Sequence, residues 1–206
     1  MAITKAELIA FVNAAYAGAY SGTDLDEALA LVLEDLAGLH VLIGTDTTAT
    51  LAAGATYFAY PDDALDTDRA VIKIVLTDAT AWAPLKWLPG GWTEYNRLME
   101  GNSGGGAGPT HYVSFDRKIY VWPAPGEDDT YTISLDYYKR HQALASGIEF
   151  NDAWKNALKF GAAYYHALLK ASAEYIALWE SKYLREKDRM RMTIPRDLTV
   201  AGGVRC

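Results

Sequence analysis

The sequence is poor in cysteine: Cys206 is its only one, which excludes a disulfide framework within the chain. Residues 1–8 lack a basic segment followed by an apolar run, and this argues against a signal peptide. No stretch approaches the ~18 uninterrupted apolar residues of a membrane-spanning helix. We therefore expect a soluble chain that is made in a reducing cytoplasm and has no membrane partner.

Basic residues are also scarce. The chain has 19 Lys and Arg against 26 Asp and Glu, so its formal net charge is −7 at neutral pH. A protein that grips a phosphate backbone needs a basic stripe, and this balance argues against one. A firm grip on the backbone of a nucleic acid is therefore not expected.

Phosphate-binding motifs are missing as well. The glycine-rich segment 101–108 lacks the Gly-Lys-Ser/Thr ending of a P-loop, and Pro109-Thr110 leads into a predicted strand instead of a helix. We interpret the segment as a flexible hairpin tip that could become ordered against a neighbouring chain. Its glycines are Gly101, Gly104, Gly105, Gly106 and Gly108.

Signatures of metal binding and of nucleophilic catalysis are absent too. The acidic turn lacks the EF-hand pattern, and the four histidines show no metal-ligand spacing. Ser103 lacks the Gly-x-Ser-x-Gly elbow, and Cys206 has no base placed beside it by any motif. We therefore predict that the protein is not an enzyme and uses no cofactor or metal. The residues considered as ligands are Asp62, Asp63, Asp66, Asp68, His40, His111, His141 and His166.

Apolar and aromatic residues, in contrast, are plentiful. Half of the 206 residues are hydrophobic, which is enough for a sizeable core in one domain or in one domain with an insertion. The six Trp and fourteen Tyr bring rigid, amphipathic rings, which serve both cores and protein interfaces.

Both ends of the chain have helical patterns. Thr4–Glu7 is a capping box that opens one helix, which should stop near Gly18. A second helix is predicted from Thr23 to about Gly38, with its buried stripe at Leu25, Leu29, Val32, Leu33 and Leu36. Near the other end, Asn151-Asp152 caps a helical stretch that we expect to break at Ala171-Ser172, with Ser172 capping the last helix.

The middle of the chain is predicted to be β-structure. Strands are expected at 55–60 and 71–76, and 82–100 is expected to be a loop with one helical turn, Thr93–Met99. The clearest pattern is three strands at 111–115, 118–122 and 130–138, interpreted as an antiparallel meander.

Together these patterns predict an α+β fold. Residues 1–40 and 146–192 each supply a helix pair, and the two pairs close into a four-helix bundle from which the β segment 41–145 projects. Residues 193–206 carry a proline and two glycines and are expected to form an extended tail.

Some aromatic residues are candidates for contacts with other chains. Trp82, Trp87 and Trp92 recur every five residues, and they either anchor in a partner or cover one end of the local core. The last helices carry more aromatic residues than one stripe holds, and the tail could add itself to a neighbour. The further candidates are Tyr164, Tyr183, Arg191, Ile194, Arg196, Leu198, Val200 and Arg205.

Two segments carry a resemblance to a known family. The sequences HYVSFDRKIYVWPAPGEDDTYTISLDYYKR (111–140) and IEFNDAWKNALKFGAAYYHA (148–167), followed by a charged helix and a loose tail, resemble the head–tail connector adaptors of tailed bacteriophages. These adaptors include the tail tubular protein A type of short-tailed phages. The shared features are a strand pair ending in a Trp-Pro-x-Pro turn, a strand ending in Tyr-Tyr, and an Asn-Asp helix start.

The resemblance implies a structural virion protein in the neck, between head and tail. It implies a homo-oligomeric ring, by resemblance a dodecamer, which docks on the portal protein and joins a downstream tail or neck protein. DNA would be a passing cargo in its channel. Two alternatives stay open: another head-completion or tail-terminator protein, or a module that binds a carbohydrate or small ligand through its Trp-rich β segment.

Overall fold

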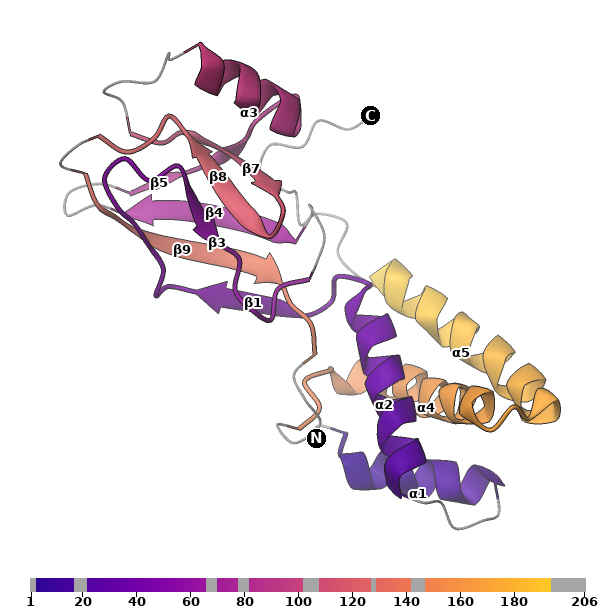
Figure 1. The fold of residues 1–206 in the computed structure, drawn as a ribbon. Coiled ribbons are helices and arrows are strands. Elements are labelled where there is room, and N and C mark those ends of the chain that lie inside the picture. Colours follow the sequence, from indigo (N-terminus) through magenta and orange to yellow (C-terminus); the bar gives the residue numbers. More distant parts are fainter. Residues whose placement is uncertain are drawn as a thin grey trace. The chain divides into compact units, whose positions relative to one another are not determined.

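The computed structural model describes residues 3–16, 22–65, 70–77, 82–101, 108–126, 129–141 and 147–193 (Figure 1). Within these residues the fold is mixed α/β, with five α-helices and two β-sheets. The contacts divide it into a helical unit, built on 3–42 and 140–193, and a β-rich unit built on 43–139.

The helical unit begins with the predicted capping box. The Thr4 amide donates to Glu7 Oε2 at 2.9 Å, and the Glu7 amide donates to Thr4 Oγ1 at 3.2 Å. Helix α1 spans Lys5–Tyr16, and its predicted end near Gly18 lies outside the described residues. Helix α2 spans Gly22–Ala37 and ends just before Gly38, as predicted. All five leucine and valine side chains of its predicted stripe are buried.

The second half of the helical unit confirms the predicted cap and break. Asn151 caps the 3₁₀ turn η2 (Asp152–Trp154) by accepting the Ala153 amide at 3.0 Å, and helix α4 follows at Lys155–Leu169. The chain turns at Ala171, whose φ is 51°, into helix α5 at Ala173–Thr193. Thr193 is therefore helical, and its hydroxyl donates to the Met190 carbonyl at 2.9 Å. The extended tail predicted from Thr193 is wrong for that residue, and 194–206 lie outside the described part.

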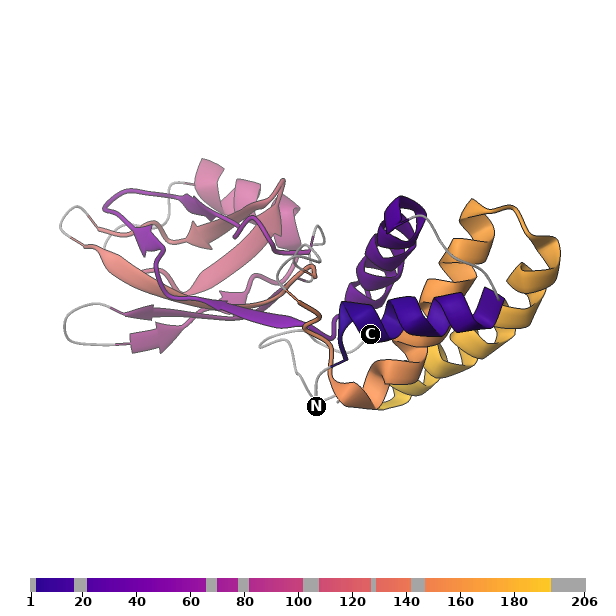
Figure 2. The ribbon, with the colours of Figure 1, turned by 90° about the horizontal axis from the view of Figure 1, so that it is seen from below.

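Helix α4 lies at the centre of the helical unit. It contacts α1, α2 and α5, and Figure 2 shows it running alongside α5. Gly161 makes the tightest approach: a Cβ placed on it would overlap the Val32 side chain and lie 2.7 Å from Cε2 of Tyr183. The core of the helical unit draws on its four helices, α1, α2, α4 and α5. Its buried members include Leu8, Val12, Leu29, Val32, Leu36, Leu158, Ala162, Tyr183 and Met190.

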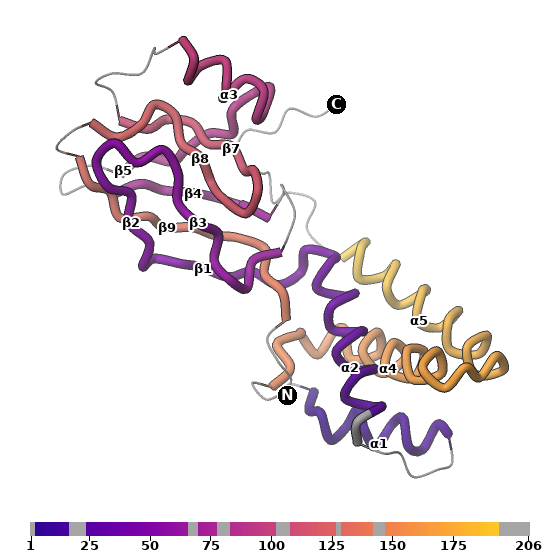
Figure 3. The backbone as a smooth tube through the Cα atoms, viewed as in Figure 1, coloured from indigo at the N-terminus to yellow at the C-terminus, as the bar shows by residue number. Residues whose placement is uncertain are grey.

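The β-rich unit contains two sheets. One has the order β1-β9-β4-β5, with β2 also pairing with β9, as the trace in Figure 3 shows, and the other has the order β3-β8-β7-β6. The elements of the β-rich unit are β1 Ile43–Asp46, β2 Thr50–Leu51, β3 Tyr57–Ala59, β4 Val71–Thr77, β5 Trp82–Pro84, β6 Lys86–Trp87, α3 Gly91–Glu100, β7 His111–Phe115, β8 Lys118–Trp122 and β9 Tyr131–Tyr138. All described pairs are antiparallel except β6 with β7.

The predicted three-strand meander is wrong in its last step. Strands β7 and β8 form the expected hairpin, but β9 joins the other sheet, between β1 and β4. Pro123 and Pro125 lie between β8 and β9, and proline has no amide hydrogen to continue a ladder. Buried side chains of both sheets form one core, which we call the shared core. It includes Phe58, Ile74, Leu76, Leu85, Tyr112, Ile119, Val121, Ile133 and Leu135.

Segment 82–100 also differs from its prediction. It holds two short strands, β5 and β6, and the predicted helical turn is a full helix, α3, of ten residues. Strands this short carry too few residues for an alternating pattern to be recognised. Helix α3 lies against β7, on the side of its sheet opposite the shared core (Figure 1).

Candidate interaction surface

An aromatic surface forms on the outer face of the sheet β3-β8-β7-β6. The register places Tyr57 opposite Tyr120, and Phe115 opposite Lys118. Side chains alternate between the two faces of a strand, and the neighbours Ile119 and Val121 point into the shared core. Tyr57, Phe115, Lys118 and Tyr120 therefore lie on the opposite face.

Helix α3 completes this surface with Trp92. The Trp92 ring stacks on Phe115 at 4.4 Å between centroids and 6° between planes, and it contacts Tyr120 at 4.7 Å. Tyr120 contacts Tyr57 at 5.4 Å. We call these four rings, Tyr57, Trp92, Phe115 and Tyr120, the aromatic strip.

The aromatic strip is open to solvent at both ends. Tyr57 is 46% exposed and Phe115 is 44% exposed, while Trp92 and Tyr120 are half-buried. Apolar surface that is partly open to solvent is a common feature of interaction sites, and Trp and Tyr are enriched among the residues that dominate binding energy at interfaces. The aromatic strip is therefore the candidate interaction surface of the described residues.

One cation accompanies the strip. The Lys118 ammonium lies 4.6 Å from the centroid of the Tyr57 ring, a cation–π contact. Its own chain gives Lys118 no ion pair within the described residues. The neighbouring Arg117 points elsewhere, donating to the Pro61 and Asp62 carbonyls at 3.4 and 3.5 Å.

The three tryptophans predicted to act together have different surroundings. Trp92 belongs to the strip. Trp87 is half-buried and packs edge-on against Tyr112, with centroids 5.5 Å apart, so it fills the local core. Trp82 lies in β5, and its side chain is outside the described part of the structure. Of the two whose side chains the structure describes, Trp92 lies in the strip and Trp87 in the local core.

Among the other candidates, Tyr183 is buried within its own chain. It is 1% exposed, because it packs in the helical core against Tyr164 and Tyr165 and its hydroxyl donates to Asp35. Tyr164 is half-buried.

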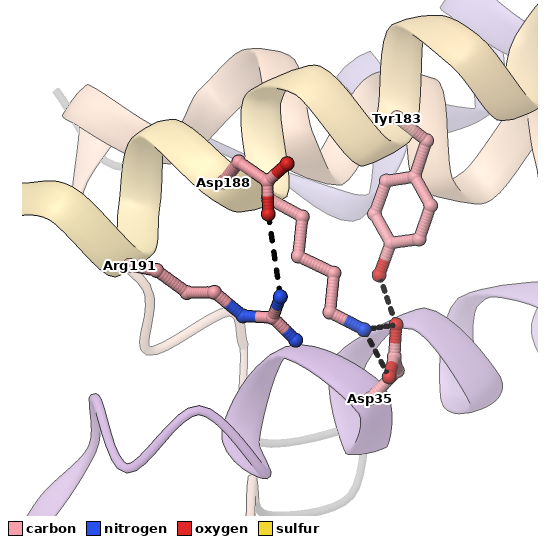
Figure 4. Close-up of polar contacts among 5 residues, drawn as sticks. Asp35, Tyr183, Asp188 and Arg191 are labelled. Atoms are coloured by element: carbon pink, nitrogen blue, oxygen red, sulfur yellow. Dashed lines mark hydrogen bonds and ion pairs between the residues drawn. The ribbon is translucent and has the colours of Figure 1, made fainter.

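Arg191 is exposed and pairs with Asp188 at 3.2 Å (Figure 4). Of the glycine-rich segment, Gly101 caps the end of α3, and a Cβ on Gly108 would overlap the Tyr131 hydroxyl. Ile194, Arg196, Leu198, Val200, Arg205, Gly104, Gly105 and Gly106 lie outside the described residues.

Asp35 is the centre of a polar network that joins α2 to α5 (Figure 4). It accepts from the Lys187 ammonium at 2.6 and 2.7 Å and from the Tyr183 hydroxyl. Burial by itself raises the pKa of Asp35, but these hydrogen bonds and the Lys187 charge outweigh it and leave that pKa below its ordinary value. Burial and the bond to Asp35 both raise the pKa of Tyr183, which keeps the phenol neutral. The network stabilises the helix packing.

A pocket of about 480 Å³ opens between the start of α4 and the end of α5. Glu186, which is buried, is the carboxylate in its wall, and both of its oxygens accept from Arg189 at 3.1 Å. Across the described residues there is no group of three His, Cys, Asp or Glu that could hold a metal ion, and no described helix is long and apolar enough to cross a membrane.

Sequence reasoning missed three of the four strip residues: Tyr57, Phe115 and Tyr120. The signal was present in part, because the alternation in 111–115 and 118–122 puts Phe115 and Tyr120 on the face opposite Ile119. The sequence does not show that β3 pairs with β8, which brings Tyr57 to the strip. It also does not show where α3 lies, which brings Trp92 to the strip.

One family model matches the chain over all of its described residues. The family model of the SU10 adaptor protein matches residues 3–205. The chain belongs to this family. It is a family of bacteriophage head–tail adaptors, structural proteins of virus assembly, and the match confirms the resemblance seen in the sequence. The SU10 adaptor match spans both the helical unit and the β-rich unit. No curated protein matches this chain.

Proposed function

We propose that this adaptor forms a ring of identical subunits in the virion neck, joins the portal to a tail or neck protein, and leaves a channel through which DNA passes. The observation that carries the proposal is the family match over residues 3–205. The net charge of −7 supports it, because a chain with an excess of acidic residues does not attract a passing phosphate backbone. The ring is a dodecamer, and it works as a structural part without catalysis.

The two units fit the needs of a ring. A closed ring of identical subunits requires heterologous contacts, in which two different patches of each subunit meet. The β-rich unit offers the aromatic strip, and the helical unit exposes separate apolar side chains such as Leu31 and Leu184. In this proposal the four helices act as one bundle, a rigid body, and the β segment inserted between them is a second domain.

Electron microscopy of the full chain mixed with its portal protein tests the proposed function. We expect a ring of this chain on one end of the portal assembly, seen as added density that is missing when the portal is imaged alone. The chain without portal is the second control, because some rings assemble only on a template. A portal that stays bare at saturating concentrations of the chain would rule the proposal out.

A truncated chain tests how the ring attaches. Removal of residues 194–206 leaves every described element intact, since α5 ends at Thr193. We expect unchanged thermal unfolding and circular dichroism but weaker binding to the portal, because short terminal segments commonly order on a partner. Binding is measured by co-sedimentation with the portal. Full recruitment of the truncated chain would show that the tail takes no part in attachment.

A further inference from the structure

We propose that the aromatic strip of one copy receives the outer face of helix α2 of a second copy, and that Lys118 of the first then pairs with Glu27 or Glu34 of the second. The proposal rests on the proposed ring, and it names the contact by which neighbouring subunits join.

The aromatic strip, with Lys118 beside it, is complementary to a partner surface that is both apolar and acidic. The strip presents flat rings with an ammonium beside them, and Lys118 has no ion pair within the described residues. A partner side chain that covers the rings also removes water from around Lys118, which strengthens its attraction to a carboxylate. The occupant should therefore carry an exposed aliphatic side chain with a carboxylate close to it.

The outer face of α2 has this composition. Glu27, Leu31 and Glu34 are all exposed, Leu31 by 36%, and the spacing of four and three residues puts them on one face of the helix. Within the described residues neither glutamate forms an ion pair. From Glu27 to Glu34 the helix rises about 10 Å, which is comparable with a row of rings whose neighbours are 4.4 to 5.4 Å apart.

Exposed leucines on α5 fit less well. Asp188 lies one helical turn after Leu184, but it is paired with Arg191. Arg185, which follows Leu184 in the sequence, is also exposed. Leu178 lies between the exposed Glu174 and the half-buried Lys182, which is one carboxylate and one ammonium. These faces carry both signs of charge, so they offer Lys118 less net attraction than α2 does.

The contact is heterologous by construction. The strip belongs to the β-rich unit and the α2 face belongs to the helical unit, so each copy has one of each. A chain of such contacts uses every strip and every α2 face once and can close into a ring. The two surfaces explain how one sequence provides both sides of the subunit boundary.

Charge reversal tests the contact in the full-length chain. One variant carries Lys118→Glu, and a second carries Glu27→Lys together with Glu34→Lys. In either variant alone the two surfaces carry like charges, and we expect the concentration needed for ring assembly on the portal to rise by about tenfold or more.

Mixing the two variants in equal amounts tests whether the surfaces meet each other. In an alternating ring the strip of the first variant, which carries the new carboxylate at position 118, meets the α2 face that carries the new ammonium groups. The other boundary joins the unchanged Lys118 to the unchanged glutamates. Every boundary then pairs opposite charges, so we expect assembly to return to near the wild-type concentration.

Controls separate this contact from general charge effects and from misfolding. Lys73→Glu on the exposed side of β4 and Glu180→Lys on α5 are single charge reversals that lie off both surfaces, and we expect wild-type assembly for each. Circular dichroism of each variant checks that it folds. Wild-type assembly of both reversal variants, or no rescue on mixing, overturns this contact and leaves the proposed ring standing. Failure of the wild-type chain itself to form a ring overturns the proposed function and this contact with it.

Discussion

Replacing Gly161 with alanine is expected to destabilise the helical unit by about 3 kcal/mol, although the same change in an open helix stabilises by about 1 kcal/mol. The reason is the crossing of α4 with α2 and α5. A methyl group on residue 161 would overlap the Val32 side chain and lie 2.7 Å from Cε2 of the buried Tyr183. Neither neighbour can move into solvent, since both belong to the core. Chemical denaturation, followed by circular dichroism, measures the free energy of unfolding.

A second substitution shows whether the overlap is the cause. Val32→Ala shortens one of the two side chains that crowd residue 161, and made alone it leaves a small cavity. Gly161→Ala with Val32→Ala should therefore be more stable than Gly161→Ala alone, a coupling of the sign expected for residues in contact. A stabilising Gly161→Ala, or strictly additive effects, would contradict the tight crossing.

Replacing Asp35 with asparagine is expected to cost about 2–3 kcal/mol at neutral pH, because hydrogen bonds to a charged group contribute about 1.5–3 kcal/mol. The amide oxygen cannot hold the Lys187 ammonium as the carboxylate does at 2.6 and 2.7 Å, and Lys187 is left largely buried without a counter-charge. Glu34→Gln is the matched control. It lies next to Asp35 on α2, is exposed and has no ion pair in the described chain, so its effect should stay within about 0.5 kcal/mol.

The cost of Asp35→Asn should depend on pH with a defined sign. The Asp35 pKa is lower in the folded chain than its ordinary value of 3.8, so the folded state favours the ionised carboxylate. This contribution is fully present above 3.8 and is lost as the pH falls through the folded pKa. The stability difference between wild type and Asp35→Asn should therefore be constant near neutrality and shrink in acid. Denaturation curves over this range check it, and a difference that widens in acid would contradict the network.

The helical unit could be predicted closely from sequence. The capping box, the Asn151 cap, the break at Ala171 and the buried stripe of α2 all follow from local rules on hydrogen bonding and on 3.6-residue spacing. Tyr183 shows the limit of those rules. Its helical spacing is visible in the sequence, but the acceptor of its hydroxyl hydrogen bond, Asp35, lies 148 residues away in the chain.

The β-rich unit could be predicted only in part. The sequence predicts strands at the positions of β3, β4, β7, β8 and β9 and the β7–β8 hairpin, but it does not predict the division of these strands between two sheets. Alternation shows that a strand has a buried face, but it does not say which strand pairs with it. Strand β9 has partners on both sides, β4 and β1, and neither adjoins it in sequence. The aromatic strip depends on the same long-range pairing, which is why only Trp92 of its four residues was a sequence candidate.

The arrangement of the helical unit also bears on how the chain acquires its structure during synthesis. The Tyr16 hydroxyl donates to the Ala163 carbonyl, 147 residues later, and α1 and α2 both pack on α4. The ribosome therefore releases these first helices, with their apolar sides uncovered, well before their partner helix exists. The β-rich unit, whose described pairs all lie within residues 43–139, is complete earlier. Its early folding would bring the flanking segments together and shorten the search that the helices must make.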